Sequence, residues 1–231
     1  MTTESGVVLV FAKAPRPGRV KTRMVPPLTP SQAAELYAKL LADVLSTTAE
    51  FARELGLRPV VAVDPAEACH EVAQSAPSEF CAVAQRGADL SQRMTWAVRE
   101  AAATGAGRVL LRGSDSPVLG GDVLRDALEA LEASDLAICP DRDGGYSLVG
   151  LRRPVPGLFE HPMSTSSVLE QTLEGAARLG LSARVLAPSF DLDRIEDLRW
   201  LAQARADGSG HLCGNTLAYL DENDLWRYAP P

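Results

Sequence analysis

Five cationic side chains stand close together near the beginning of the sequence. They are Lys13, Arg16, Arg19, Lys21 and Arg23, and Glu4 is the only acidic residue among the first 30. Arginine can clamp phosphate oxygens bidentately and lysine binds them as a point charge, so the pattern indicates a polyphosphate ligand. The alternative is a solvated basic loop. The P-loop motif is not met, because Val20 replaces the glycine that it requires before Lys21 and Thr22.

Carboxylates from two distant stretches are candidates for a metal site. Asp115 lies in the run Gly113-Ser114-Asp115-Ser116-Pro117, and Asp191 and Asp193 follow much later. Mg²⁺ usually takes one or two carboxylates together with substrate phosphates. Alternation along an extended segment points Asp191 and Asp193 to one face. The simpler interpretation is that Asp115 and Asp193 cap turns or helices.

Two glycine-containing stretches offer backbone to a ligand. Gly144 and Gly145 precede Tyr146, and their backbone can approach a ligand closely or simply form a turn. Gln85 and Gly87 offer an amide side chain and a bare backbone to a nucleotide base. Each stretch alone is a weak signal, so these residues matter only if the fold gathers them at one site.

The composition limits the kinds of partner that the protein is expected to bind. The 231 residues carry a formal net charge of -7, which argues against a nucleic-acid partner, because phosphate backbones attract basic proteins. The four cysteines form no CxxC pair, so we expect reduced thiols in the cytoplasm rather than a zinc site or a disulfide framework. The sequence shows neither a signal sequence nor an apolar run of membrane-spanning length, and no membrane partner is expected.

Apolar runs and helical stripes alternate along the chain and must position these side chains. Strands are predicted at 7–11, 59–63, 80–84, 108–112, 135–139, 146–151 and 183–186, and helices at 65–74, 90–103, 122–132, 167–179 and 194–206. Another helix begins after Thr29, which forms a capping box with Gln32. Strands separated by helices predict an α/β fold with a mostly parallel sheet, whose ligands bind beyond the carboxyl ends of the strands.

The chain is expected to form one catalytic domain. No linker divides residues 1–206, which we assign to that domain. Residues 207–231 are Gly-rich and then end in Pro, and we expect them to form a loosely packed tail in which Leu225 and Trp226 dock on the core.

Four motifs resemble one bacterial family, the GT-A-superfamily proteins labelled arsenosugar-biosynthesis-type glycosyltransferases. The motifs are Lys13-Ala14-Pro15-x-Pro17-Gly18-x-Val20-Lys21-Thr22-Arg23, Gly113-Ser114-Asp115-Ser116-Pro117, Asp143-Gly144-Gly145-Tyr146-x-Leu148-Val149-Gly150-Leu151 and Asp191-Leu192-Asp193. The sequence is more distantly similar to deazaflavin-cofactor guanylyltransferases and molybdenum-cofactor nucleotidyltransferases. The resemblance runs from about residue 7 to 201 and implies a Rossmann-like three-layer α/β/α sandwich with a mixed, mostly parallel sheet.

The resemblance also implies roles for individual residues. The nucleotide would be bound by Lys13, Gly18, Lys21, Arg23, Gln85, Gly87, Gly113 and Asp115. Mg²⁺ (or Mn²⁺) would be held by Asp115 with Asp191 or Asp193. The acceptor side would comprise Gly144, Gly145, Tyr146 and His161, and the predicted catalytic residues are Asp115, Lys21 and Asp143. The sequence departs from the family pattern at Met163, where Trp is more usual, and at Arg194-Ile195, where Thr-Pro is more usual.

Three functions are compatible with these residues. A glycosyltransferase would move a sugar from a nucleotide-diphosphosugar to a small-molecule acceptor, with Mg²⁺ neutralising the departing diphosphate and Asp143 or His161 accepting a proton. A nucleotidyltransferase would join a nucleoside triphosphate to a phosphorylated small molecule and release diphosphate, with no obligatory base. A nucleotide-binding module without turnover is the third. Of the three, we expect the glycosyltransferase. The oligomeric state stays open, with a homodimer as one option.

Overall fold

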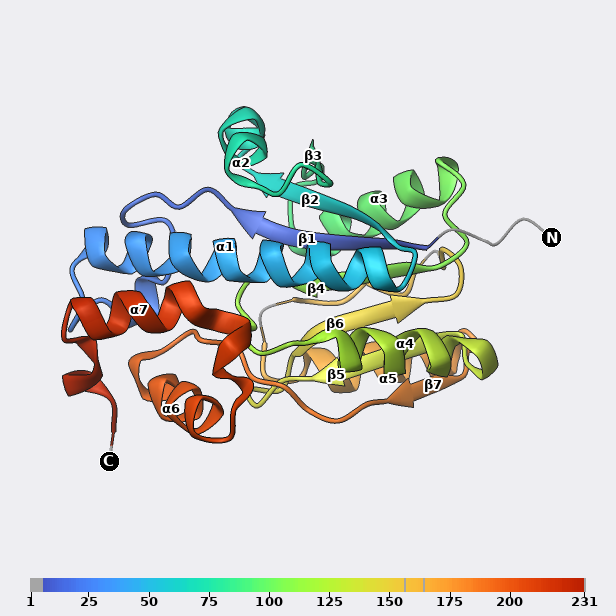
Figure 1. The fold of residues 1–231 in the computed structure, drawn as a ribbon. Coiled ribbons are helices and arrows are strands. Elements are labelled where there is room, and N and C mark those ends of the chain that lie inside the picture. Colours follow the sequence, from blue (N-terminus) through green and yellow to red (C-terminus); the bar gives the residue numbers. More distant parts are fainter. Residues whose placement is uncertain (1–5, 156, 164, 231) are drawn as a thin grey trace.

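The centre of the protein is a seven-stranded sheet with the spatial order β3-β2-β1-β4-β6-β5-β7 (Figure 1). The structure is a computed structural model that describes residues 6–155, 157–163 and 165–230. The strands are β1 (Val7–Lys13), β2 (Arg58–Asp64), β3 (Cys81–Ala84), β4 (Val109–Gly113), β5 (Leu136–Pro140), β6 (Tyr146–Leu151) and β7 (Ala183–Val185). Only β6 is antiparallel to its neighbours, β4 and β5. The predicted mixed and mostly parallel sheet is confirmed.

Helices cover both faces of the sheet, which makes three layers (Figure 1). Helices α1 (Pro30–Glu54) and α4 (Gly121–Ala133) pack on one face, and α3 (Leu90–Ala103) and α5 (Val168–Arg178) pack on the other. Successive strand residues face opposite ways, so Val8 and Val10 of β1 join the core under α4 and α1, while Leu9 joins the core under α3. A strand apolar on both sides is typical of a parallel sheet buried between helices.

The remaining helices are shorter. The face covered by α1 also receives α2 (Cys69–Ser75), α6 (Leu198–Ala206) and α7 (Gly214–Glu222). Among the described residues, 3-10 helices span Thr22–Met24, Ala66–Ala68, Ile195–Asp197, Ser209–Cys213 and Leu225–Tyr228. In the part of the chain that the structure describes, no helix is long and apolar enough to cross a membrane.

Helix α1 begins where the capping box predicts. The Gln32 backbone N–H donates to the Thr29 hydroxyl at 3.2 Å, and the Thr29 N–H donates to Gln32 Oε1 at 2.9 Å. These bonds satisfy backbone groups that a helix start would otherwise leave unpaired. The helix then carries two polar side chains into the protein: Tyr37 reaches the end of β1, and Asp43 reaches the C-terminal segment.

The segment after residue 206 is not the loosely packed tail that the sequence predicts. Its helix α7 packs along α1 (Figure 1), and Leu220 and Leu225 are fully buried. The buried carboxylate of Asp43 accepts four hydrogen bonds of 2.7 to 3.0 Å from the backbone and side chains of Asn215 and Thr216. A carboxylate at the start of a helix interacts favourably with the positive end of the helix dipole. The predicted docking of Leu225 and Trp226 on the core is confirmed, and Cys213, Leu217, Tyr219, Leu220, Tyr228 and Ala229 also take part in that packing.

Candidate active site

Strand β1 delivers the basic loop to the carboxyl edge of the sheet. The backbone N–H of Lys13, the last residue of β1, donates to the Tyr37 hydroxyl at 3.0 Å. The same hydroxyl lies 2.8 Å from Ser114 Oγ, at the end of the neighbouring strand β4. Burial raises the pKa of Tyr37 to about 12, with the Asp115 charge adding to it. Tyr37 therefore remains a neutral hydroxyl that joins the two strand ends.

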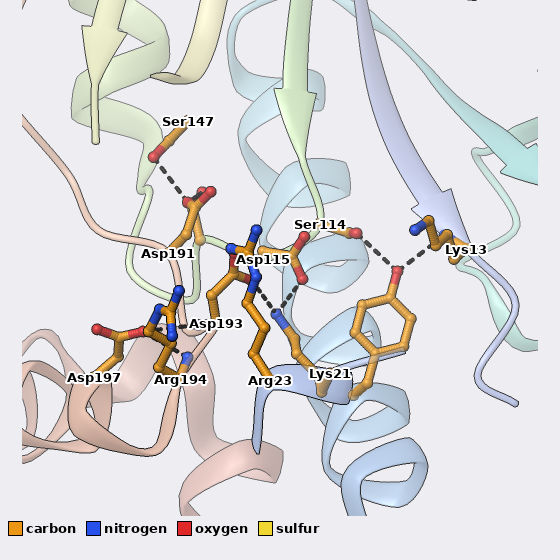
Figure 2. Close-up of polar contacts among 12 residues, drawn as sticks. Lys13, Lys21, Arg23, Ser114, Asp115, Ser147, Asp191, Asp193, Arg194 and Asp197 are labelled. Atoms are coloured by element: carbon orange, nitrogen blue, oxygen red, sulfur yellow. Dashed lines mark hydrogen bonds and ion pairs between the residues drawn. The ribbon is translucent and has the colours of Figure 1, made fainter. Parts of the chain in front are cut away.

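Lys21 is buried at the centre of the site and is held in an unusual backbone conformation. Its φ of 47° lies in the left-handed region, where residues other than glycine are uncommon. The Lys21 ammonium forms an ion pair with Asp115 Oδ1 and lies 3.2 Å from Asp193 Oδ1 (Figure 2). Burial lowers the pKa of Lys21, but the two carboxylates outweigh it and hold that pKa above its usual value. The ammonium therefore stays charged between two acids.

Arg23 adds a second, more exposed cation to the same acid. Its Nη1 lies 3.4 Å from Asp193 Oδ2, and half of the Arg23 side chain is exposed. The three segments that meet here are far apart in sequence, at residues 21–23, 115 and 193. Their meeting confirms that the basic loop and the two acidic stretches share one rim of the protein.

Hydrogen bonds explain why the acidic stretches meet. The Leu192 N–H donates to the Asp115 carbonyl at 2.9 Å, so the two segments run side by side. Below them, the buried guanidinium of Arg112 donates to the Ser116 carbonyl at 3.1 Å and to the Thr48 hydroxyl at 2.9 Å. Arg112 thus shapes the loop after β4 from underneath.

Asp191 and Asp193 occupy different surroundings, although they are two residues apart. Asp191 Oδ1 accepts hydrogen bonds from Ser147 Oγ at 2.9 Å (Figure 2) and from Ser116 Oγ at 2.5 Å. Burial, followed by the charge of Asp115, raises the pKa of Asp191 to about 6. Asp193, in contrast, faces Lys21 and Arg23. Asp193 is therefore the better placed of the two beside Asp115, and a metal role for Asp191 stays a prediction.

The loop between β5 and β6 is organised around a carboxylate that the sequence analysis passed over. Asp141 Oδ1 accepts the backbone N–H groups of Asp143 at 2.9 Å and Gly145 at 3.0 Å. Gly144 has a φ of 94°, and a side chain there would meet the Ser166 carbonyl oxygen at 2.0 Å. The paired glycines therefore serve a tight turn and close packing of loop on loop. An acid two residues before another acid and a glycine pair is the signal that could have identified Asp141.

A cleft of about 770 Å³ opens along this edge of the sheet. Most of the predicted site residues line it: Lys13, Lys21, Arg23, Gln85, Gly113, Asp115, Asp143, Gly145, Tyr146, Asp191 and Asp193. Asp141, Ser147 and Tyr37 also line it and were not predicted. A cleft of this size at the carboxyl ends of parallel strands is the usual ligand site of such a sheet.

Four predicted residues do not line this cleft. Gly18 lies on the outer part of the basic loop with open space around it, and Gly87 packs against Gln92 where α3 begins. Gly144 packs on Ser166 instead. His161 lines a neighbouring pocket of about 590 Å³, and its Nε2 lies 2.9 Å from the Thr172 hydroxyl. Three of these positions thus shape loops, and the imidazole lies to one side of the cleft.

Gln85 has a structural task in addition to its place in the cleft wall. Its side-chain amide donates to the carbonyl of Ala12 at 3.1 Å and to that of Ala62 at 2.9 Å. Both amide hydrogens are therefore used to tie β1 to β2, and only Oε1 is available to a ligand. The predicted contact with a base can then come only through an acceptor oxygen.

The donor set suits a hard divalent cation. Asp115 and Asp193 present carboxylate oxygens, the ligands that Mg²⁺ prefers, and the Lys21 ammonium already lies between them. Among the described residues no group of three or more His, Cys, Asp or Glu is arranged to hold a metal ion. A Mg²⁺ ion at this place would thus have two protein carboxylates and would need further oxygen ligands.

Comparisons with known proteins add two findings. A family model described as "uncharacterized protein conserved in bacteria" (DUF2064) matches residues 47–167. A crystal structure from Desulfovibrio desulfuricans G20, provisionally assigned as a nucleotide-diphospho-sugar transferase, is similar with a TM-score of 0.87 and 30% sequence identity, over 99% of this chain and 100% of that chain. No curated protein matches the sequence.

Structures of lower identity share the fold. A 4-diphosphocytidyl-2C-methyl-D-erythritol synthase has a TM-score of 0.59 at 14% identity, over 88% of this chain and 99% of that chain. A cytidylyltransferase from Leptospira borgpetersenii has a TM-score of 0.59 at 11% identity, over 96% of each chain. The predicted Rossmann-like fold is confirmed, and the similar structures support the predicted class of enzyme, a transferase.

Proposed function

This chain belongs to the DUF2064 family of bacterial proteins, and on that premise we propose that it is a Mg²⁺-dependent transferase that moves a sugar from a nucleotide-diphosphosugar to a small acceptor. The similar protein from Desulfovibrio desulfuricans G20, with its provisional assignment as a nucleotide-diphospho-sugar transferase, supports this choice. The observation that carries the proposal is the division of charge along the cleft.

The cleft has a basic half and an acidic half. The basic half is lined by Lys13, Arg19, Lys21 and Arg23. The acidic half is formed by residues 141–147 and 163–168, which contribute Asp141 and Asp143, hydroxyls and apolar groups to the cleft wall. Arg142 of this stretch does not line the cleft and stacks on Trp200 instead. Arg93 and Arg194 line the cleft outside these two stretches. Cations bind a diphosphate, whereas carboxylates repel a phosphorylated acceptor. The acidic half therefore suits an acceptor with a neutral hydroxyl.

Each half has its own task in the proposed reaction. Lys13, Lys21 and Arg23 hold the diphosphate oxygens, while Asp115 and Asp193 would hold the Mg²⁺. A bound metal ion would neutralise the negative charge that develops on the departing diphosphate. Lys21 is preorganised for its part, because its side chain is buried and its position is set by two carboxylates before any ligand arrives. The four free cysteines favour action in the cytoplasm.

A second candidate is nucleotidyl transfer. The four cations of the basic half match the charge of a triphosphate at least as well as that of a diphosphate. In this reaction the acceptor phosphate would enter the acidic half, where Asp141 and Asp143 line the cleft and residues 141–147 and 163–168 contribute no cation to its wall. That placement makes nucleotidyl transfer the weaker of the two candidates.

One assay separates the two reactions. The protein is incubated with Mg²⁺ and either nucleotide-sugars plus a polyol or nucleoside triphosphates plus sugar phosphates. We expect nucleoside diphosphate to be released from a nucleotide-sugar. Inorganic diphosphate released only when a triphosphate is present would instead establish nucleotidyl transfer. Asp115→Asn serves as the inactive control in both arms.

A further inference from the structure

We propose that Asp141 is the catalytic base that accepts the proton of the acceptor hydroxyl, an inference that rests on the proposed glycosyl transfer. Asp141 directly follows Pro140, the last residue of β5, and its half-buried side chain lines the acidic half of the cleft. A general base must stand where the acceptor binds, and this is the half of the cleft that suits a neutral hydroxyl.

The two carboxylate oxygens of Asp141 are used differently. Oδ1 accepts two backbone hydrogen bonds, from Asp143 at 2.9 Å and from Gly145 at 3.0 Å, which fix the orientation of the carboxylate. Oδ2 receives no backbone hydrogen bond from the described part of the chain, and the Asp143 side chain lies within hydrogen-bonding reach of the Asp141 carboxyl group. A side chain at position 145 would place its Cβ 2.9 Å from Oδ2. The glycine at 145 therefore leaves this oxygen uncovered.

The proton affinity of Asp141 suits the task. Burial is the main cause that raises the pKa of Asp141 to about 7, and the neighbouring carboxylates of Asp143 and Asp191 add to it. A base with a pKa near the working pH is about half unprotonated at neutrality and still takes up a proton readily. The shift therefore supports the assignment that the geometry makes.

The other candidate bases are less well placed. Asp143 is exposed, and its Oδ1 accepts the Gly145 N–H at 3.2 Å, so its carboxylate is held by one backbone hydrogen bond where that of Asp141 is held by two. His161 lines the neighbouring pocket, with its Nε2 beside Thr172. Asp191 also lines the cleft with a fixed carboxylate, but its hydroxyl partners Ser116 and Ser147 hold it beside the proposed metal site. Asp141 combines a fixed orientation with a position in the acidic half of the cleft.

The step balances as a direct displacement. The acceptor O–H proton moves to Asp141 Oδ2 as the acceptor oxygen forms a bond to the anomeric carbon of the sugar. The bond from that carbon to the diphosphate oxygen breaks, and its electron pair leaves with the nucleoside diphosphate. Attack from the side opposite the leaving group inverts the anomeric configuration, so the proposal also fixes the stereochemistry of the product.

The test compares Asp141→Asn with Asp143→Asn. Asparagine at 141 keeps an oxygen that accepts both backbone N–H groups, so the loop is retained while the base is lost. Donor affinity is measured by calorimetry with UDP-glucose, UDP-N-acetylglucosamine and GDP-mannose. Turnover is measured as nucleoside diphosphate release with Mg²⁺ and with glycerol or water as acceptor. The configuration of the glycoside formed with glycerol is read by NMR.

We expect Asp141→Asn to lower kcat by about 10²- to 10⁴-fold, the usual contribution of a general base, with donor affinity unchanged within about threefold, a shift below 1 kcal/mol. Asp143→Asn should lower kcat by less than about tenfold, well short of such a contribution. If Asp141→Asn does not fold, Asp141→Glu carries the same test, because moving the carboxylate by one methylene should lower kcat at unchanged affinity.

Three results would overturn the assignment of Asp141 while leaving glycosyl transfer intact. They are near-wild-type kcat in a folded Asp141 variant, a larger loss in Asp143→Asn, and a product with retained configuration. Wild-type protein that releases no nucleoside diphosphate from any donor would overturn the proposed function itself, and the inference with it. The two failures are therefore distinguishable in one experiment.

Discussion

The two halves of the cleft are stabilised in different ways. In the basic half, Lys21 is held by carboxylates 94 and 172 residues away in sequence. In the acidic half, Asp141 is held by backbone N–H groups two and four residues away. The position of Lys21 therefore depends on distant parts of the chain coming together, whereas the orientation of Asp141 is set within one short loop. This difference suggests that charge changes will disturb the first half and backbone changes the second.

The largest effect is expected at Asp115, which pairs with Lys21 in the basic half. Asp115→Asn keeps the shape of the side chain and removes the charge that faces Lys21 and the proposed Mg²⁺. We expect kcat for nucleotide-sugar turnover to fall by about 10²- to 10³-fold, the usual cost of losing one electrostatic contact at a reacting centre. Turnover and Mg²⁺ dependence are measured together. Wild-type turnover in the variant would remove Asp115 from the site.

The sequence predicts the fold and the location of the two halves of the cleft better than it predicts the contacts within them. The strand–helix alternation and the strand-end positions of Lys13 and Asp115 locate both halves, because the carboxyl ends of parallel strands lie on one edge. The pairing of Lys21 with Asp193 is not visible in the sequence, since it depends on how the segment after β7 returns along the loop after β4. The distinction between Asp141 and Asp143 depends on burial, which a turn motif does not reveal.

The packing of the C-terminal segment is another long-range contact that the sequence does not reveal. Its composition predicts a loose tail, but the four hydrogen bonds that anchor it all end on Asp43 of α1. Asp43 lies 172 residues before Asn215. A buried acid on an otherwise apolar stripe of a helix could have suggested such a partner, but not which segment supplies it.

A pair of glycine substitutions tests whether the acidic half depends on its backbone. Gly144→Ala should destabilise the protein by about 3 kcal/mol, because the new Cβ meets a carbonyl oxygen and the φ of 94° is strained for alanine. This corresponds to a fall in the melting temperature of roughly 6–12 °C for a domain of this size.

Gly18→Ala, on the outer part of the basic loop, is the matched control. It also has a positive φ, of 73°, but nothing lies within 4 Å of the added Cβ. Only the conformational cost remains, about 1 kcal/mol. Equal melting temperatures for the two variants would show that packing against Ser166 does not matter.

Lys21→Met tests whether the basic half depends on charge. The variant leaves the carboxylates of Asp115 and Asp193 without their shared cation, and it removes one charged contact to the nucleotide. We expect nucleotide affinity to fall by about 10- to 100-fold, the range for a charge-assisted hydrogen bond. Without nucleotide, millimolar Mg²⁺ should raise the melting temperature of the variant more than that of the wild type, because a divalent cation can replace the ammonium.

The control for this variant is Lys13→Met, which removes an exposed lysine from the same half but leaves the ion pairs of Lys21 intact. It should lower nucleotide affinity without increasing the response to Mg²⁺ alone. An identical Mg²⁺ response in wild type and Lys21→Met would mean that Asp115 and Asp193 do not form the metal site.

The smallest effect is expected at Arg23, on the rim of the basic half. Its ion pair with Asp193 spans 3.4 Å between partly exposed side chains, and such pairs contribute about 0–1 kcal/mol to stability. Arg23→Ala should therefore leave the melting temperature nearly unchanged and lower nucleotide affinity about threefold at low salt. This loss of nucleotide affinity should shrink as ionic strength rises, because salt screens exposed charges more than buried ones.

The control is Arg227→Ala, which removes an equally exposed arginine that pairs with Asp224 at 3.1 Å outside the cleft. It should leave nucleotide affinity unchanged at every salt concentration. A salt-independent loss at Arg23 would mean that this side chain is buried by the ligand and belongs with Lys21 in the interior of the site.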